Sequence, residues 1–379
     1  MQVKQIYEIV NTITEEITGE SGLVLEDLSN IVSVGTAIFN ASSVDNYVKK
    51  LVDRIGRTVF VNRPYESTAP KIARDSWEYG SVLQKVRCEL PEAVENKTWS
   101  LVKGQSVDPF VFSPPDVTVK YFNNKTTFEV DMSFTDRQVK ESFINADEMN
   151  RFFSMIENRI RTKLTLDKDA LIMRTIVNLI AEKIASNSNV INLLSIYNTT
   201  HGTSLAPVQA INNADFLRHS CGIIKLYTER LKRPSTLYNN HGYVTHTPKE
   251  YQHLVLLSEY ATALDVQLYS TSYHNEFLEM PKFETTPMWQ GTGTGVTADV
   301  FGVTSAIKAK TASDGTTVDT NGIIGVLFDR DACMICNDNP RVTSQYNGKG
   351  EYTNFFYKED CSYFNDLAEN VVVFTVNAV

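Results

Sequence analysis

The clearest hydrophobic pattern in the sequence is helical and extends over residues 145–186. Asn145 with Glu148 three positions later has the form of a capping box at a helix start. Apolar residues then recur on one face without an intervening Pro or Gly: Met149, Phe152, Phe153, Ile156, Ile160, Leu164, Leu171, Ile172, Ile176, Leu179, Ile180 and Ile184. Asp167-Lys168-Asp169 leaves open one helix of about 60 Å or two shorter ones. A single apolar stripe of this length predicts a long strut rather than the centre of a compact enzyme.

Residues 57–142 change to the alternation that is typical of strands, and half of the 12 prolines lie there. Apolar residues alternate up to the turn Asn123-Asn124 and alternate again after it: Val117, Val119 and Tyr121, then Phe128, Val130, Met132 and Phe134. This pattern predicts one β-hairpin. An isolated hairpin is only marginally stable, so we expect it to lie against another part of the chain or a neighbouring subunit.

The rest of the chain mixes helical and strand-like segments. Helices are expected at 44–55, 213–233 and 251–263, the first ended by Gly56. Strands are expected at 266–273, 322–328, 352–357 and 371–376. The fold class that follows is α+β.

Composition and charge narrow the class of protein. The 379 residues include 42% hydrophobic ones, too many for a disordered chain and enough for two or three folding units. Five cysteines, an odd number, indicate free thiols in a reducing compartment. The first 20 residues lack the uninterrupted apolar centre of a signal peptide, and no apolar run reaches the ~20 residues of a membrane span.

The strongest enzyme-like feature is the apolar segment Ile323–Phe328, which is followed by Asp329 and Asp331. Two carboxylates two positions apart after a strand are typical of metal-dependent phosphohydrolases, which share a metal and a phosphoryl group between them. Only 48 residues follow Asp331, too few for the doubly wound sheet of that class. A phosphohydrolase that uses Asp329 and Asp331 is therefore the alternative, and we expect the protein not to be an enzyme.

Other motifs lack the context that their chemistry needs. Cys333 and Cys336 have redox or zinc spacing, but they continue a strand-like run without further ligands, which favours buried thiols. Gly293 and Gly295 resemble a dinucleotide-binding turn, but no clear strand precedes them, which favours a surface loop. His241, His246 and His253 match no compact metal motif, so we expect no catalytic, cofactor or metal site.

Charge argues against nucleic-acid binding. The chain carries 36 Lys and Arg against 45 Asp and Glu, a formal charge of −9, whereas nonspecific DNA binding depends on positive surfaces. The one local basic cluster consists of Lys225, Arg230, Lys232 and Arg233, and we interpret it as the solvated face of a helix.

The order of elements resembles the major capsid proteins of tailed bacteriophages, whose fold herpesviruses share. The resemblance is greatest to small podoviruses of Gram-positive hosts. It is carried by Leu51-Val-Asp-Arg-Ile-Gly56, by Ile323-Ile-Gly-Val-Leu-Phe-Asp-Arg-Asp-Ala332, by Tyr346-Asn-Gly-Lys-Gly350 and by Tyr352-Thr-Asn-Phe-Phe-Tyr357.

The resemblance implies an architecture in five parts. An N-terminal arm takes residues 1–56, and an extended loop with flanking strands takes 57–142. A spine helix of the peripheral domain takes 143–189, an axial domain 190–349, and returning peripheral-domain strands with the terminal strand 350–379.

The resemblance also implies a function and partners. Copies of the protein would form the hexamers and pentamers of an icosahedral shell around double-stranded DNA, without sequence-specific DNA binding. Scaffolding and portal proteins are expected partners, with assembly in the host bacterial cytoplasm and no membrane or cofactor. Trp99, Phe110 and Phe112 are the expected subunit-interface residues, because aromatic side chains flanked by prolines make rigid contacts.

Overall fold

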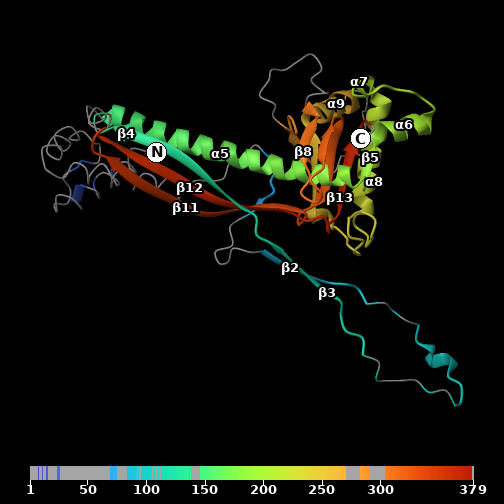
Figure 1. The fold of residues 1–379 in the computed structure, drawn as a ribbon. Coiled ribbons are helices and arrows are strands. Elements are labelled where there is room, and N and C mark those ends of the chain that lie inside the picture. The colour runs from blue at the N-terminus through green and yellow to red at the C-terminus, as the bar shows by residue number, and fades with distance from the viewer. Residues whose placement is uncertain are drawn as a thin grey trace. The chain divides into compact units, whose positions relative to one another are not determined.

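A computed structural model gives the fold of the chain (Figure 1). It describes residues 7, 11, 14–15, 24–25, 69–74, 83–91, 93, 95–104, 106, 110, 112–135, 137, 146–269, 282–290 and 304–377. The expected helix at 44–55 and the glycine-rich segment 291–295 lie outside these residues. The chain divides into two compact units. The first comprises residues 1–77, 125–172 and 336–362, and the second 78–124, 173–335 and 363–379.

The first unit contains a four-stranded sheet in the order β1, β11, β12, β4. The strands are β1 (Ala73–Arg74), β4 (Lys125–Thr135), β11 (Cys333–Asn347) and β12 (Tyr352–Asn365). β12 and β4 are antiparallel in a continuous register from Tyr352 opposite Thr135 to Ser362 opposite Lys125. Buried and half-buried residues alternate along most of β12, so one face of this strand is covered.

Helix α5 (Ala146–Ala185) is continuous over 40 residues, which decides between the two alternatives for this segment. Asp167, at the suspected break, forms an i,i+4 ion pair with Lys163 at 2.7 Å that supports the helix. In the first unit the helix buries Ile160 and Leu164, and its buried Lys168 pairs with the buried Glu359 of β12.

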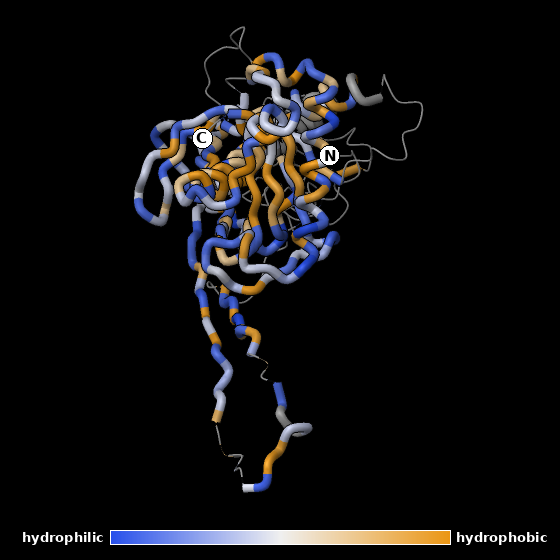
Figure 2. Tube along the Cα trace, turned by 90° about the vertical axis from the view of Figure 1, so that its right-hand side faces the viewer, coloured by the Kyte–Doolittle hydropathy of each residue, from blue (hydrophilic) through white to orange (hydrophobic). Residues whose placement is uncertain are grey.

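The second unit is built around a five-stranded sheet in the order β5, β13, β10, β6, β7. The strands are β5 (Val190–Asn192), β6 (Gln252–Leu257), β7 (Glu284–Thr286), β10 (Ile323–Asp329) and β13 (Val371–Thr375). β10 lies antiparallel to both β13 and β6, and every residue of β10 and β13 is buried. Figure 2 shows the hydrophobic residues gathered on these strands. The expected strands at 322–328 and 371–376 are thereby confirmed, and β12 extends the expected strand at 352–357.

The helices of the second unit are α6 (Leu193–His201), α7 (Pro207–Ala210), α8 (Ala214–Arg230) and α9 (Ser258–Tyr269), with the short 3-10 helices η1 (Lys97–Ser100) and η2 (Lys249–Tyr251). α6 packs against β13, and α9 packs against β6 and β7. The expected helix at 213–233 is confirmed as α8, whose N-cap Asn213 accepts a hydrogen bond from Phe216 N at 2.9 Å. Ser220 of α8 and Tyr260 of α9 share a buried hydrogen bond of 2.6 Å. Among the described residues, no helix has the length and apolar character to cross a membrane.

The expectations for residues 251–273 are wrong in part. Residues 252–257 form β6 rather than the start of a helix, and residues 266–269 end helix α9 rather than starting a strand. A short apolar run such as His253-Leu-Val-Leu-Leu257 has no periodicity that separates a buried strand from a buried helix. Its burial beside β10 decides for the strand.

The predicted hairpin across Asn123-Asn124 is also wrong, although both of its strands exist. β3 (Val117–Phe122) pairs with β2 (Leu83–Cys88) in the second unit, and β4 pairs with β12 in the first. Alternation predicts that a segment is a strand, but the partner of that strand is chosen by long-range packing. A second small ribbon, β8 (Ile307–Lys310) with β9 (Thr317–Thr320), also lies in the second unit.

Candidate functional site

Among the described residues, the largest group of exposed apolar side chains lies on one segment of the second unit, from Leu83 to Phe122, which we call the arm. Its exposed large hydrophobic residues are Val86, Leu90, Trp99, Leu101, Val102, Phe110, Phe112, Val117, Val119 and Tyr121. Trp99 is 100% exposed, Phe110 89% and Phe112 85%. Large contiguous apolar patches are rare on monomeric proteins, so this segment is the candidate interaction surface.

The paired strands of the arm have an unusual distribution of polar and apolar residues. β2 and β3 are antiparallel, with Val86 opposite Val119 and Lys85 opposite Lys120. Val86 is 60% exposed, whereas Lys85 is half-buried. Successive side chains of a strand point to opposite faces, so the apolar face of the ribbon is exposed and its charged face is partly covered.

The charged face contacts two carboxylates in the turn between β12 and β13. Lys85 Nζ lies 2.8 Å from Asp366 Oδ2 and 2.6 Å from Glu369 Oε1, and Lys120 Nζ lies 2.9 Å from Asp366 Oδ1. Arg87 Nη2 contacts Glu369 Oε1 at 2.5 Å, and Arg87 Nη1 donates a hydrogen bond of 3.1 Å to the carbonyl of Ala368. These contacts join the paired strands β2 and β3, which form the base of the arm, to the rest of the second unit.

Burial and charge act in opposite directions on these groups. Burial alone raises the pKa of Asp366, but Lys85 and Lys120 outweigh it and hold the pKa below its usual range. Burial lowers the pKa of Lys85, and the two carboxylates outweigh it and raise that pKa. Both groups therefore stay charged at neutral pH.

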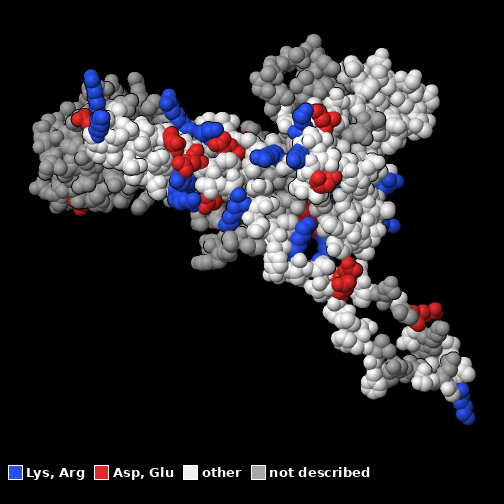
Figure 3. Space-filling model, in the orientation of Figure 1, with Lys and Arg blue, Asp and Glu red and all other residues white. Residues whose placement is uncertain are grey.

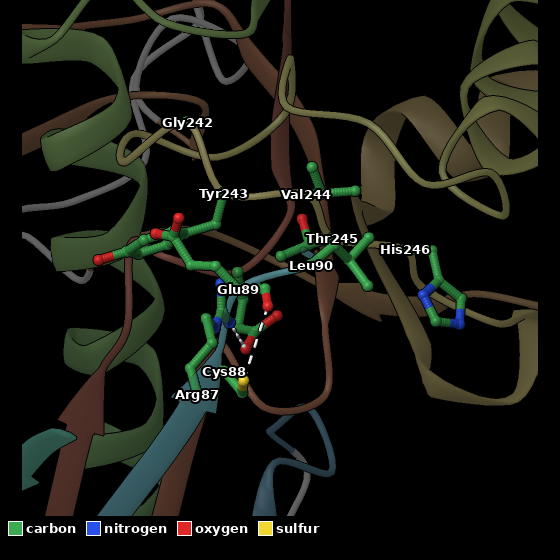
Figure 4. A pocket seen from close by; sticks show the side chains of 10 residues that line it. Arg87, Cys88, Glu89, Leu90, Gly242, Tyr243, Val244, Thr245 and His246 are labelled. Carbon is green, nitrogen blue, oxygen red and sulfur yellow. Dashed lines mark hydrogen bonds and ion pairs between the residues drawn. The ribbon is translucent and has the colours of Figure 1, made fainter. Parts of the chain in front are cut away.

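Two further contacts tie the base of the arm to β12. The rings of Phe122 and Phe364 stack with their centroids 4.5 Å apart, and Tyr363 N donates a hydrogen bond of 3.1 Å to Asn124 O. A cavity of about 300 Å³ lies beside this base (Figure 4). It is lined by Arg87–Leu90 of the arm, by Gly242–His246 and by Glu369, and the guanidinium of Arg87 lies 4.9 Å from the ring centre of Tyr243.

The carboxylates of the phosphohydrolase alternative have structural contacts. Asp329 is buried, its Oδ2 accepts a hydrogen bond of 2.7 Å from the Thr247 hydroxyl, and its Oδ1 accepts one of 2.8 Å from Asp331 N. The Thr247 hydroxyl also accepts a bond from Asn370 Nδ2 at 3.1 Å. Burial raises the pKa of Asp329. Asp329 thus holds the turn after β10, and the comparisons below do not support the alternative.

The remaining candidate motifs have structural surroundings as well. Cys333 and Cys336 are buried in β11, and burial raises the pKa of the Cys333 thiol. In the part of the chain that the structure describes, no three His, Cys, Asp or Glu side chains come together in a group able to hold a metal ion.

The basic cluster lies at the end of α8, where Lys232 pairs with Glu229 at 2.6 Å and Arg230 lies over the Tyr227 ring at 5.2 Å. On the face shown in Figure 3, the described Lys and Arg residues are interspersed with Asp and Glu. These contacts agree with a solvated helix face.

The structure places all three predicted interface residues on the arm, but sequence reasoning missed the carboxylates at its base. Asp366 and Glu369 lie about 280 residues along the chain from Lys85 and Arg87. No motif marks them, and only the aromatic and proline content of the arm carried a signal.

Two solved structures have a similar mixed helix and sheet fold. The capsid structure of Staphylococcus phage Andhra aligns at 10% identity with a TM-score of 0.54, covering 83% of this chain and 87% of that chain. A chain from the structure of the head fiber and inner core protein gp22 of native bacteriophage P68 aligns at 10% identity with a TM-score of 0.50, covering 81% of this chain and 83% of that chain. The fold is therefore one found in phage capsid structures.

The family model of the Phi29-like phage major capsid protein matches residues 9–375. The chain belongs to this family. It is 24% identical to the major capsid protein of Streptococcus phage Cp-1 over 230 residues, which are 59% of each protein. It is 20% identical to the major capsid protein of Bacillus phage GA-1 over 359 residues, 93% of this chain and 66% of that protein. The matches thus span less than two thirds of the length of either relative.

Proposed function

We propose that this protein is the repeating subunit of a phage head. Many copies assemble into the hexamers and pentamers of an icosahedral shell that encloses double-stranded DNA. Family membership over residues 9–375 and the two relatives that are major capsid proteins support this role. The protein is then a virion component that is assembled in the host bacterial cytoplasm.

The finer architecture belongs to the same proposal. Residues 1–56 form the N-terminal arm, 57–142 the extended loop with its flanking strands, and 143–189 the spine helix of the peripheral domain. Residues 190–349 form the axial domain and 350–379 the returning strands. The 40-residue length of α5 supports its assignment as the spine helix. The exposed segment from Leu83 to Phe122, with its paired strands β2 and β3, supports the assignment of residues 57–142 as the extended loop.

The partners follow from the same role. They are further copies of the chain, scaffolding and portal proteins, and packaged DNA that is enclosed without sequence-specific contacts. The role needs neither a cofactor nor catalysis. The contacts of Asp329 with Thr247 and with the backbone of Asp331 support a structural rather than a catalytic carboxylate.

One observation carries the assignment of the interface, namely the exposure of Trp99, Phe110 and Phe112 on the arm. In the assembled shell these side chains are covered by a neighbouring copy. Obligate interfaces commonly bury more than about 2,000 Å² and are rich in apolar groups. A two-stranded ribbon is only marginally stable by itself, and it becomes more stable when a neighbouring subunit covers its exposed apolar side chains.

The test replaces Phe110 and Phe112 with Ser in the full chain. Burying a Phe contributes about 1.5–3 kcal/mol, so the double variant loses about 3–6 kcal/mol per copy at the interface. We expect a folded subunit that does not close shells, as seen by circular dichroism and electron microscopy.

The matched control replaces Leu237 and Val208 with Ser, because these side chains are 70% and 67% exposed but lie outside the arm. The control should assemble normally. Shells formed by the Phe110→Ser, Phe112→Ser variant at the wild-type yield would contradict the interface assignment.

A further inference from the structure

The angle between the arm and the rest of the second unit depends on the contacts of strands β2 and β3 at the base of the arm. β2 and β3 form a two-stranded sheet of their own, and among the described residues neither strand has a second partner. Such a ribbon has no core, so its own strands do not hold it at a fixed angle. The contacts of its charged face therefore decide where the exposed apolar face points.

The charged face is unfavourable without its carboxylates. Lys85 of β2 lies directly opposite Lys120 of β3, and like charges in directly opposed positions destabilise a strand pair. Asp366 lies between them, with one carboxylate oxygen 2.8 Å from Lys85 and the other 2.9 Å from Lys120. One buried carboxylate thus forms an ion pair with each of the two ammonium groups, and it does so only when the ribbon lies on the turn that carries Asp366.

Asp366 is itself rigidly placed. Its side chain is 1% exposed, and its backbone N donates a hydrogen bond of 2.7 Å to the carbonyl of Ala332. Its Oδ1 accepts a further bond of 3.1 Å from Ala368 N. Glu369, three residues later, contacts Arg87 at 2.5 Å and Lys85 at 2.6 Å. Two anions in a fixed turn therefore face three cations of the ribbon.

We propose that Asp366 and Glu369 form an ionic socket that sets the angle of the arm and keeps the apolar face with Val86 and Val119 turned outward to a second copy of this chain. Asp366 and Glu369 are then positioning residues for the interface, while the apolar residues make the contact. The importance of this angle for assembly rests on the proposed function, whereas the socket itself is a property of the single chain.

The experiment measures the angle of the arm directly. Nitroxide labels are attached to cysteines introduced at Gln84 in β2 and at Lys249 in η2, both exposed, in a chain whose exposed Cys88 is replaced by Ser. The distance between the two nitroxides is measured by pulsed electron–electron double resonance. The labelled full chain is diluted with unlabelled chain, so that only distances within one subunit contribute. The reference chain should give a single narrow distance peak.

Asp366→Asn should abolish the narrow peak, because two opposed lysines then lack their shared carboxylate. Adding Lys120→Gln to Asp366→Asn should restore it, because the opposition of the lysines is removed while Glu369 still holds Lys85 and Arg87. A role of Asp366 in packing alone would not respond to a change at Lys120. Asp319→Asn is the matched control, since it removes an ion pair of 2.6 Å with Lys308 in the other small ribbon, and it should leave the peak unchanged.

A narrow peak in Asp366→Asn would overturn the proposal. So would a loss of the peak, or of folding, that Lys120→Gln does not reverse. The measurement does not depend on shells, so its outcome is separate from that of the proposed function. A chain that keeps a narrow distance peak but never forms shells would refute the proposed function. It would not contradict the proposal that Asp366 and Glu369 set the angle of the arm.

Discussion

Lys183 provides the sharpest test of how charge is buried in the second unit. Its side chain is fully buried in α5, where Nζ donates hydrogen bonds to Asn240 Oδ1 at 2.6 Å and to the carbonyl of Tyr238 at 3.2 Å. Both acceptors are neutral. Burial therefore lowers the pKa of Lys183 from 10.5 to about 8.

The sign and size of the effect on stability follow from these two pKa values. Between pH 8 and pH 10.5 the unfolded chain holds this proton and the folded chain does not, so stability rises with pH across that window. Below pH 8 both states are protonated, and the cost of the buried charge is fully present. The difference of 2.5 between the values corresponds to about 3 kcal/mol, at 1.36 kcal/mol for each pKa unit.

The perturbation is Lys183→Met, which keeps an unbranched side chain, one heavy atom shorter, and removes its charge. The variant avoids the free-energy cost of burying a charged ammonium group. It also leaves Asn240 Oδ1 and the carbonyl of Tyr238 without their hydrogen-bond donor, which costs about 1–3 kcal/mol for each acceptor. Its stability should thus be close to that of the wild type near pH 7.5. Toward pH 10.5 the wild type should gain about 3 kcal/mol on the variant.

The assay is urea unfolding of the unassembled chain at a series of pH values, followed by tryptophan fluorescence. Trp289 is buried in the second unit, where its indole N–H donates to the carbonyl of Ile323, so it reports on the unit that holds Lys183. Other titrating groups are common to both chains and cancel in the difference. Parallel pH profiles for the two chains would refute the lowered pKa of Lys183.

Two further predictions concern packing. Gly325→Ala should lower the free energy of unfolding by about 1–3 kcal/mol, because the added Cβ would lie 2.5 Å from Leu256 Cδ2. In the control Gly222→Ala on α8, the added Cβ meets no atom within 4 Å, so this variant should not be destabilised. Equal urea midpoints for the two variants would contradict the prediction. Lys168→Met should cost about 3–5 kcal/mol by leaving Glu359 charged and buried, and adding Glu359→Leu should recover most of that loss. Circular dichroism in urea measures this pair, and a double variant no more stable than the single one would count against a buried ion pair.

The sequence by itself determined the elements with a strong local period. The helix of residues 146–185 and α8 follow from apolar residues at helical spacing. β10 and β13 have no such period, and their short apolar runs favoured strands because they are rich in the β-branched residues Ile and Val. The sequence also led us to expect interface residues at Trp99, Phe110 and Phe112, because aromatic side chains flanked by prolines make rigid contacts. In each case the signal lies within a few neighbouring residues.

Only the tertiary structure decided which segments lie together. The alternation of Val117–Tyr121 is the same whether β3 pairs with β4 or with β2, because alternation specifies faces and not partners. The apolar run of β6 became a strand because β10 lies beside it. The opposition of Lys85 to Lys120, and the Asp366 carboxylate between them, depend on strand register and on a turn about 280 residues away. Contacts of that range leave no period in the sequence, because each depends on the whole fold being in place.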